Sequence, residues 1–356
     1  MIQLLRTQRY TGVCVLLLAL AASVLRGGRA AGRGDLKNGK PGWELIWSDE
    51  FEYFDPTKWE HQYEDGCSLG ICKWGNKERS WYTDKPSNVR VADGQLTLEA
   101  REEAGESKAH LIQQCWDRCG ASCAGEWNVP PEHVPACVQD CGRDRCPSLK
   151  YSSSRIRTFG KFSISPNKKR QPRDVVKIEA RIKLDCGDGM WPAFWLLPEE
   201  GATKDCSGCG KYGIWPRSGE IDIMEMFGGK DNTNIHGTVH YGDVGQWVHR
   251  TFSSELKAAV SKDWHTYGIE WSMETIKFTL DGKQYGQAIK ATALSPGWWS
   301  AGNANGPFDT NFHLLLNLAA GGSYTNNTPD DAISRTIAEG RNTMTVDWVR
   351  VWGSAR

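Results

Sequence analysis

The sequence lacks net charge. Its 43 Lys and Arg residues equal its 43 Asp and Glu residues in number, so the formal net charge is zero. A chain without excess positive charge has no long-range attraction to nucleic acid or to acidic membrane surfaces. We therefore expect neither of these as a partner.

The sequence also lacks an apolar run long enough to span a bilayer. The run from Val13 to Leu25 has thirteen residues without a charge, whereas a spanning helix needs roughly 20. Arginines precede this run and small residues follow it, which is typical of a secretory signal peptide, with an uncleaved signal anchor as the alternative. We expect a signal peptide at 1–31, a flexible lead-in at 32–42, no lipid anchor, and a secreted, extracellular protein.

Long helical periods are scarce, and short alternating apolar runs take their place. They are separated by Gly, Pro, Asn and Asp, and 38 glycines supply turns. DGQL at Asp93 and DGKQ at Asp281 are candidate hairpin turns. This pattern predicts an antiparallel sandwich or barrel. The clearest runs are Glu44 to Trp47, Gln95 to Ala100, Lys177 to Leu184, Thr266 to Trp271, Ile276 to Leu280 and Thr345 to Trp352.

Three acids stand close together in the stretch GEIDIMEMFGG, which runs from Gly219 to Gly229. As a strand, this stretch places Glu220 and Asp222 on one face and the isoleucines on the other. Glu225 breaks the period, because a regular strand would bury its carboxylate in the apolar face, at a cost of several kcal/mol as an order of magnitude.

A single-residue β-bulge at Met224 resolves this conflict. It returns Glu225 to the face of Glu220 and leaves Met226 facing the core. At roughly 3.3 Å per residue, the two glutamate Cα atoms then lie about 13 Å apart, which leaves about 5 Å between the carboxyl groups. Retaining glycosidases place their two carboxyl groups about 5–5.5 Å apart and inverting ones about 6.5–9.5 Å, so the spacing favours retention.

Two other interpretations of the acids stay open at this point. Alternating acids are often only a solvated face, and three carboxylates also suit a calcium ion. The neighbouring aromatic residues favour a sugar-binding cleft, because Trp191, Trp195 and Trp215 precede the acids and His240 follows them. The chain has 17 tryptophans, and some of these must belong to the core.

The acid stretch and six further segments together resemble glycoside hydrolase family 16, in particular the laminarinase-type endo-1,3-β-glucanases of animals and bacteria. The resemblance covers about residues 43–352 apart from one insertion. It implies an all-β jelly roll of two curved antiparallel sheets with a concave substrate groove, and a catalytic domain at 43–356. The further segments are ELIWSDEF (Glu44 to Phe51), KWGNKERSWYT (Lys73 to Thr83), WPAFWLLP (Trp191 to Pro198), HGTVHY (His236 to Tyr241), FHLLLNLAAGG (Phe312 to Gly322) and VDWVRVW (Val346 to Trp352).

The resemblance implies a role for each acid. Glu220 matches the nucleophile and Glu225 the general acid/base, with Asp222 between them. Three carboxylates this close cannot all stay ionised, so one pKa must rise, and Glu225 would hold the proton. No cofactor is expected for catalysis.

We expect the substrate to contact Trp215, Trp191, His240, Asn76 and Arg155, the last two because they lie in matching family segments. For the tryptophans and His240, packing in the core is the alternative. Family members often bind a structural calcium on the convex side. The matching positions here are Glu50, Gly94 and Asp347, with backbone oxygens as further ligands.

The insertion lies at 112–147 and carries six cysteines. Cysteines four residues apart lie on one side of a helix, so two such runs with a Pro-rich connector suggest a helical hairpin. We expect nested disulfides, one of 15 possible arrangements. Its role is open: a wall of the cleft, a partner surface or mere elaboration. The expected pairs are Cys123–Cys137, Cys119–Cys141 and Cys115–Cys146.

Five further cysteines follow the expected signal peptide. Cys67 and Cys72 are expected to close a small loop, and Cys186, Cys206 and Cys209 can form only one pair among themselves. One thiol is therefore left over. A zinc half-site at the last two is the weaker interpretation, because no second half is evident. Asn326 begins an Asn-Asn-Thr sequon and is a candidate glycosylation site.

These features predict a secreted, monomeric, retaining endo-β-1,3-glucanase that acts on laminarin-like glucans. A non-catalytic glucan recognition protein is the first rival, although such proteins lose the catalytic acids and this chain has all three. A hydrolase of another β-linked polysaccharide and a transglycosylase are the others.

Overall fold

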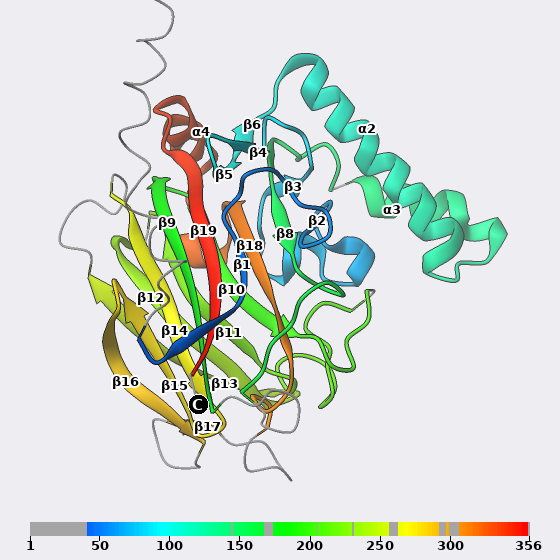
Figure 1. The fold of residues 1–356 in the computed structure, drawn as a ribbon. Coiled ribbons are helices and arrows are strands. Elements are labelled where there is room, and N and C mark those ends of the chain that lie inside the picture. The colour runs from blue at the N-terminus through cyan, green and yellow to red at the C-terminus, as the bar shows by residue number, and fades with distance from the viewer. Residues whose placement is uncertain are drawn as a thin grey trace, which may run out of the picture.

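The computed structural model describes residues 41–354 apart from 144, 167–173, 205, 230, 256–262, 292–296 and 299–305. The expected signal peptide and most of the lead-in at 32–42 lie outside the described residues. Two large antiparallel sheets dominate the fold, and few helices accompany them (Figure 1). Among the helices of the described part, none is long and apolar enough to cross a membrane.

The larger sheet has nine strands in the order β17-β16-β15-β14-β9-β19-β5-β4, with β1 paired to β19. The six runs expected to be strands all lie in this sheet. Its strands are β1 (Trp43–Asp49), β4 (Val89–Ala92), β5 (Gln95–Glu99), β9 (Val175–Cys186), β14 (His265–Ser272), β15 (Thr275–Leu280), β16 (Lys283–Ala291), β17 (Gly297–Trp298) and β19 (Asn342–Ser354).

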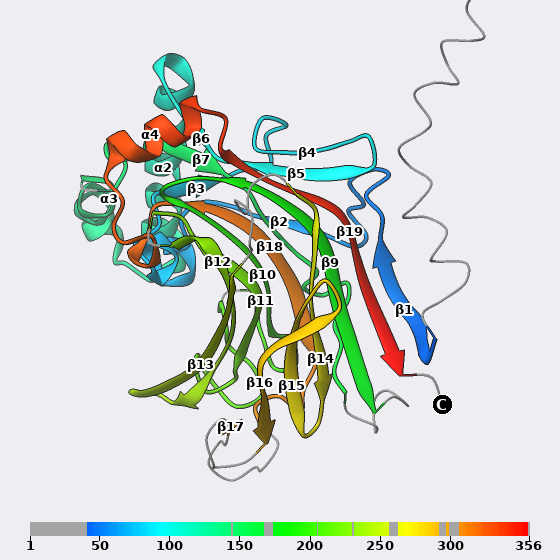
Figure 2. The same cartoon turned by 90° about the vertical axis from the view of Figure 1, so that its left-hand side faces the viewer.

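The second sheet has seven strands in the order β13-β12-β11-β10-β18-β8-β2. It is nested inside the curve of the nine-stranded sheet (Figure 2). Its strands are β2 (Glu60–Gln62), β8 (Arg155–Arg157), β10 (Met190–Pro198), β11 (Glu220–Phe227), β12 (Asp231–Asp243), β13 (Gln246–Glu255) and β18 (Phe312–Ala320). A small third sheet joins β3 (Ser80–Tyr82), β7 (Tyr151–Ser153) and β6 (Arg101–Glu102).

The core lies between the two large sheets and follows from the alternation of the strands. In β9, Ile178, Ala180 and Ile182 are fully buried, while the residues between them alternate toward the outer face. In the seven-stranded sheet, Phe194 and Ile221 belong to the same core cluster. Because one face of each sheet packs inward, the other face of the seven-stranded sheet is left to form the concave surface. The expected jelly-roll sandwich is therefore present.

The two expected hairpin turns are confirmed. Asp93 and Gly94 join β4 to β5 with φ of 54° and 69°, and Asp281 and Gly282 join β15 to β16 with φ of 51° and 75°. Positive φ at both central residues is the type I′ geometry, whose twist matches that of the flanking strands.

The helices are mostly outside the sandwich. The Cys-rich insertion forms a helical hairpin that projects from one side of the sheets, near β2 and β3 (Figure 1). Its first helix begins at Gly105, earlier than the start at 112 that the family comparison suggested. The helices are α2 (Gly105–Ala121), a π-helical turn (Ser122–Glu126), a short 3-10 turn (Pro131–His133), α3 (Val134–Arg143) and α4 (Asp330–Ala338); further 3-10 turns are Cys67–Leu69, Cys72–Gly75 and Ser323–Thr325.

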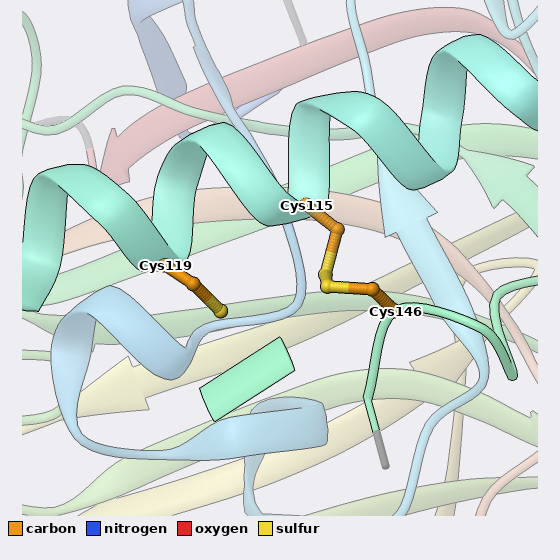
Figure 3. Close-up of side chains that lie close together, drawn as sticks. All are labelled: Cys115, Cys119 and Cys146. Carbon is orange, nitrogen blue, oxygen red and sulfur yellow. A yellow bond between two sulfur atoms is a disulfide. The ribbon is translucent and has the colours of Figure 1, made fainter. Parts of the chain in front are cut away.

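The nested disulfides of this hairpin are confirmed as Cys115–Cys146, Cys119–Cys141 and Cys123–Cys137. Sulfurs of Cys115, Cys119 and Cys146 lie within 4.8 Å of one another, but the first and last are bonded to each other (Figure 3). No thiolate is left there for a metal. The other pairs are Cys67–Cys72 and Cys206–Cys209, and Cys186 is the buried free thiol.

Candidate active site

The bulge in β11 is present where the sequence predicted it. Ala193 of β10 lies opposite Glu225, and Phe194 lies opposite Met224. The next residue of β10, Trp195, lies opposite Asp222, so Ile223 has no counterpart. Because β11 has one residue more than its neighbour over this stretch, two successive side chains turn into the core and Glu225 returns to the concave face.

The register on the other side of β11 gives the spacing of the two glutamates. Glu220 lies opposite His240 of β12, and Glu225 lies opposite His236. Four residues of β12 therefore span the distance, which is about 13 Å at roughly 3.3 Å per residue. This equals the spacing that the sequence suggested.

The two glutamates and Asp222 line a groove of about 780 Å³ on the concave face. This volume lies in the usual range of ligand pockets, about 300–1,000 Å³. The groove crosses the strands from β13 to β8 and continues to the chain around residues 71–78. Five tryptophans line it, and flat indole faces suit the apolar faces of sugar rings. They are Trp74, Trp191, Trp195, Trp215 and Trp247.

Each glutamate has its own tryptophan partner. Trp215 donates its indole N–H to Oε2 of Glu220 over 3.1 Å, and its side chain is 37% exposed. Trp191 donates to Oε1 of Glu225 over 2.9 Å and is only 7% exposed, packed edge-on against Phe227. The surroundings of Glu225 are therefore drier than those of Glu220.

Burial of the acids alters their protonation. Burial and then repulsion from Asp222 raise the pKa of Glu225 well above its ordinary value, against His240 and the Trp191 hydrogen bond. The same two causes raise the pKa of Glu220 to about 8, opposed by His240, Arg155 and Trp215. Burial also raises the pKa of Asp222, and a hydrogen bond with Glu220 opposes this rise. The pKa of Glu225 thus rises as expected, but the pKa values of Glu220 and Asp222 rise with it.

His240 lies over Asp222. Its Nε2 is 2.9 Å from Oδ2 of Asp222 and 3.7 Å from Oε1 of Glu220. Trp247 donates its indole N–H to Nδ1 of His240 over 3.0 Å. Because Nδ1 accepts this bond, the neutral ring carries its proton on Nε2, the nitrogen nearest Asp222. The pair of Trp247 and His240 therefore places a ring nitrogen beside the central acid.

The other two expected contact residues line the same groove. Asn76 lies on its rim, and Arg155 lies on β8, 3% exposed. The guanidinium of Arg155 lies between the rings of Trp74 at 4.0 Å and Trp195 at 4.7 Å. Its Nε donates to Gln62 over 2.6 Å. Its buried Nη2 has no hydrogen-bond partner among the described residues.

Several groove residues were missed by sequence reasoning. Trp247 reaches the site only because β13 pairs with β12, and nothing in its local sequence marks it. Trp195 was left between core and groove, and it lies in the groove, where its N–H donates to Oδ1 of Asn317 over 2.7 Å. On one strand, residues at even spacing share a face. Trp195 lies four residues after Trp191, so the strand period alone could have placed both in the groove.

The residues expected to hold calcium have other partners. Glu50 accepts bonds from Arg350 at 2.8 and 2.9 Å, and Asp347 accepts from Arg181 at 2.6 Å. A calcium ion there would face two guanidinium groups. The two carboxylates, while paired with these arginines, do not fit such an ion. A calcium site at Glu50, Gly94 and Asp347 stays a prediction. Glycosylation of Asn326 also stays a prediction; the residue is exposed next to a 3-10 turn.

Known proteins are similar to this chain. A family model described as "Glycosyl hydrolases family 16" matches residues 148–350, more than half of the chain. The chain is 31% identical to "Glucan endo-1,3-beta-glucosidase A1" of Niallia circulans. The match covers 87% of this chain and 38% of the Niallia circulans protein. It is 30% identical to "Glucan endo-1,3-beta-glucosidase" of Cryptopygus antarcticus, with coverage of 87% of this chain and 92% of the other.

A solved structure of an endo-1,3-glucanase is also similar to this chain. The X-ray structure of an endo-beta-1,3-glucanase from Pyrococcus furiosus matches with a TM-score of 0.60 and 30% identity, over 88% of this chain and 95% of that one. The bulged acid strand, the nested sheets and these matches agree. The chain is a glycoside hydrolase and belongs to family 16.

Proposed function

We propose that this protein is a secreted, monomeric, retaining endo-β-1,3-glucanase. The observation that carries the proposal is the pair of glutamates on one face of β11, brought there by the bulge and lining one groove. The names of the similar proteins, which are endo-1,3-β-glucanases, support the substrate.

In the first step, Glu225 acts as the acid. Its dry surroundings keep it protonated, so it can give its proton to the glycosidic oxygen as the bond breaks. Glu220 is the more exposed of the two. Its pKa of about 8 means that it attacks the anomeric carbon only in its deprotonated form, whose share grows as the pH approaches that value. A covalent glycosyl-enzyme results, and the shortened glucan leaves with the proton.

In the second step, Glu225 has lost its proton and takes one from water. The activated water attacks the anomeric carbon and releases Glu220. Two displacements on one carbon restore the β configuration. Asp222, held by His240, keeps a hydrogen bond to Glu220 and carries the charge that raises the pKa of Glu225.

Secretion is supported by the cysteines. The described cysteines form five disulfides, which persist in oxidising compartments. The segment expected to be the signal peptide precedes the described residues. A neutral polysaccharide also fits a chain with no net charge.

A reducing-sugar assay tests the proposal against its rivals. We expect activity on laminarin, with oligosaccharides of mixed length from the start, because endo action cuts internal bonds. A recognition protein would bind laminarin and release no sugar. Higher activity on mixed-linkage glucan, agarose, carrageenan or xyloglucan would change the substrate, and products longer than the substrate would indicate a transglycosylase.

A further inference from the structure

The chain at residues 64–78, here called the wall loop, forms one end of the groove. Its members Ile71, Trp74, Asn76 and Glu78 line the groove beside Arg155. Trp74 places its ring on the Arg155 guanidinium, at 4.0 Å. The wall loop is therefore one of the contacts that position the Arg155 guanidinium at this end of the groove.

The wall loop has a costly backbone. Four of its residues other than glycine adopt positive φ: Glu64 (70°), Lys73 (54°), Trp74 (52°) and Lys77 (58°). This backbone region is unfavourable for residues with a Cβ, and conformations of this kind persist only where their surroundings enforce them. The Cys67–Cys72 disulfide closes only a small part of the loop, so its outer side needs other support.

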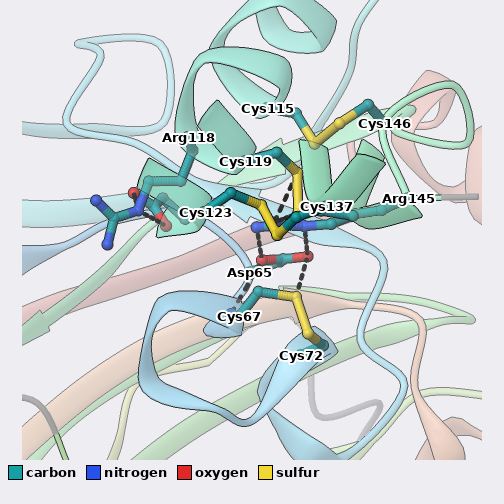
Figure 4. Close-up of a disulfide and its surroundings, with 12 residues drawn as sticks. Asp65, Cys67, Cys72, Cys115, Arg118, Cys119, Cys123, Cys137, Arg145 and Cys146 are labelled. Carbon is teal, nitrogen blue, oxygen red and sulfur yellow. Dashed lines mark hydrogen bonds and ion pairs between the residues drawn. A yellow bond between two sulfur atoms is a disulfide. The ribbon is translucent and has the colours of Figure 1, made fainter. Parts of the chain in front are cut away.

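The Cys-rich hairpin supplies contacts on that side. Arg145, 8% exposed, forms a two-pronged ion pair with the carboxylate of Asp65, which is 2% exposed. A second ion pair joins Arg118 of α2 to Glu64, with Nε 2.9 Å from the carboxylate. Figure 4 shows Arg145 between the hairpin disulfides and Asp65, with the Cys67–Cys72 loop on the far side.

The ion pair continues into the backbone of the wall loop. The Asp65 carboxylate accepts the N–H of Cys67 at 3.2 Å, and its carbonyl accepts the N–H of Trp74 at 2.9 Å. On the hairpin side, Arg145 lies over the ring of Trp81 at 5.4 Å, and its Nη1 is 3.5 Å from sulfurs of the Cys119–Cys141 bridge. A chain of contacts thus runs from a disulfide to the aromatic floor of the groove.

We propose that the Cys-rich hairpin is a brace for the wall loop, with Arg145 as the positioning residue. Through Asp65 and Trp74 it fixes the end of the groove at Arg155. Binding of glucan units that reach from the carboxylates toward β8 therefore depends on an insertion that contributes no residue to the groove lining. This inference rests on the proposed β-1,3-glucanase function for its substrate.

The test removes the brace contact without leaving a lone buried charge. Arg145→Met strands the Asp65 carboxylate and endangers folding, so the double variant Asp65→Asn/Arg145→Met is made beside it. Arg143→Ala is the matched control, because it removes an exposed arginine of the same hairpin whose partner, Asp140, lies on the same helix. Arg145→Lys tests whether charge alone is enough.

Two readouts are compared. Amide hydrogen exchange should become about tenfold faster at residues 64–78 in the double variant, with β10 and β11 unchanged, because the wall loop loses its contact with the hairpin and opens locally more often. KM for laminarin should rise about tenfold, the effect of roughly 1.4 kcal/mol of lost binding. The kcat/KM for an activated aryl glycoside of one β-1,3-linked disaccharide should change less than twofold, since it needs only the carboxylates.

Unchanged exchange in the wall loop of the double variant would overturn the brace. An equal fall in kcat/KM for laminarin and the aryl glycoside would overturn it too, because that pattern reports general damage. A wild-type protein inactive on every β-1,3-glucan would refute the proposed function instead, and the exchange experiment would still decide the brace.

Discussion

The two ends of β11 hold the same side chain in different surroundings. Glu220 lies beside Trp215, which is 37% exposed, whereas Glu225 lies beside Trp191, which is 7% exposed and packed on Phe227. Each carboxylate accepts one indole N–H, so the tryptophan hydrogen bonds do not distinguish them. The access of water does, and the proposed mechanism therefore takes Glu225 as the acid and Glu220 as the nucleophile.

Removal of either carboxylate should have the largest effect. We expect Glu220→Gln and Glu225→Gln each to lower kcat on laminarin by about 10³-fold or more while laminarin still binds. The two ends should then differ with an aryl glycoside whose leaving group needs no proton. In Glu225→Ala, azide should restore turnover and give the β-glycosyl azide, whereas in Glu220→Ala it should give the α-azide. The reverse pattern would exchange the roles.

Asp222→Asn should change the pKa values of Glu220 and Glu225 together. Repulsion from Asp222 raises the pKa of Glu220 and of Glu225, so both limbs of the pH profile of kcat/KM should move to lower pH. We expect kcat to fall about 10²-fold, because the orientation of Glu220 is also lost. Movement of a single limb would show that Asp222 acts on only one glutamate.

The tryptophans provide a matched pair with smaller effects. Each indole N–H lowers the pKa of its own glutamate. Trp191→Phe should therefore raise the pKa of the acid and move the alkaline limb to higher pH. Trp215→Phe should raise the pKa of the nucleophile and move the acid limb to higher pH. A few-fold loss of kcat/KM should accompany each change, and the same limb moving in both variants would contradict the comparison.

Stability should change in the direction opposite to activity. The folded protein holds protons on Glu220 and Glu225 that the unfolded chain loses at ordinary pKa values. The contribution of Glu220 is thus present below about pH 4.5 and is lost as the pH rises through about 8. Glu220→Gln should raise the free energy of unfolding by about 1–3 kcal/mol at pH 8 and by little at pH 4.

The exposed Glu339→Gln is the control for that measurement, because its side chain is 49% exposed. It should change stability at neither pH. If the glutamine at 220 stabilised the protein equally at both pH values, burial of the charged carboxylate would not be the cause. Thermal or denaturant unfolding at the two pH values makes the comparison.

Local patterns predicted much of this molecule. The bulge followed from one acid out of period, and the nested disulfides followed from cysteines at helical spacing. The type I′ turns followed from two Asp-Gly pairs. Each of these rests on residues close in sequence, where the period of a strand or helix fixes which side chains share a face.

The remaining features depend on contacts between distant segments. Trp247 reaches His240 only across the β12–β13 pairing, and Arg145 meets Asp65 from 80 residues away. No local period encodes such meetings. The same holds for the arginine partners of Glu50 and Asp347, which weigh against the calcium ion expected from family resemblance.

The most direct test of the paired glutamates is the configuration of the first product. Proton NMR of laminarin hydrolysis, recorded before mutarotation proceeds, observes the new anomeric proton. With both carboxyl groups flanking one sugar ring at the close spacing set by the bulge, the β anomer should appear first. Initial formation of the α anomer would mean a single displacement by water and would contradict the account.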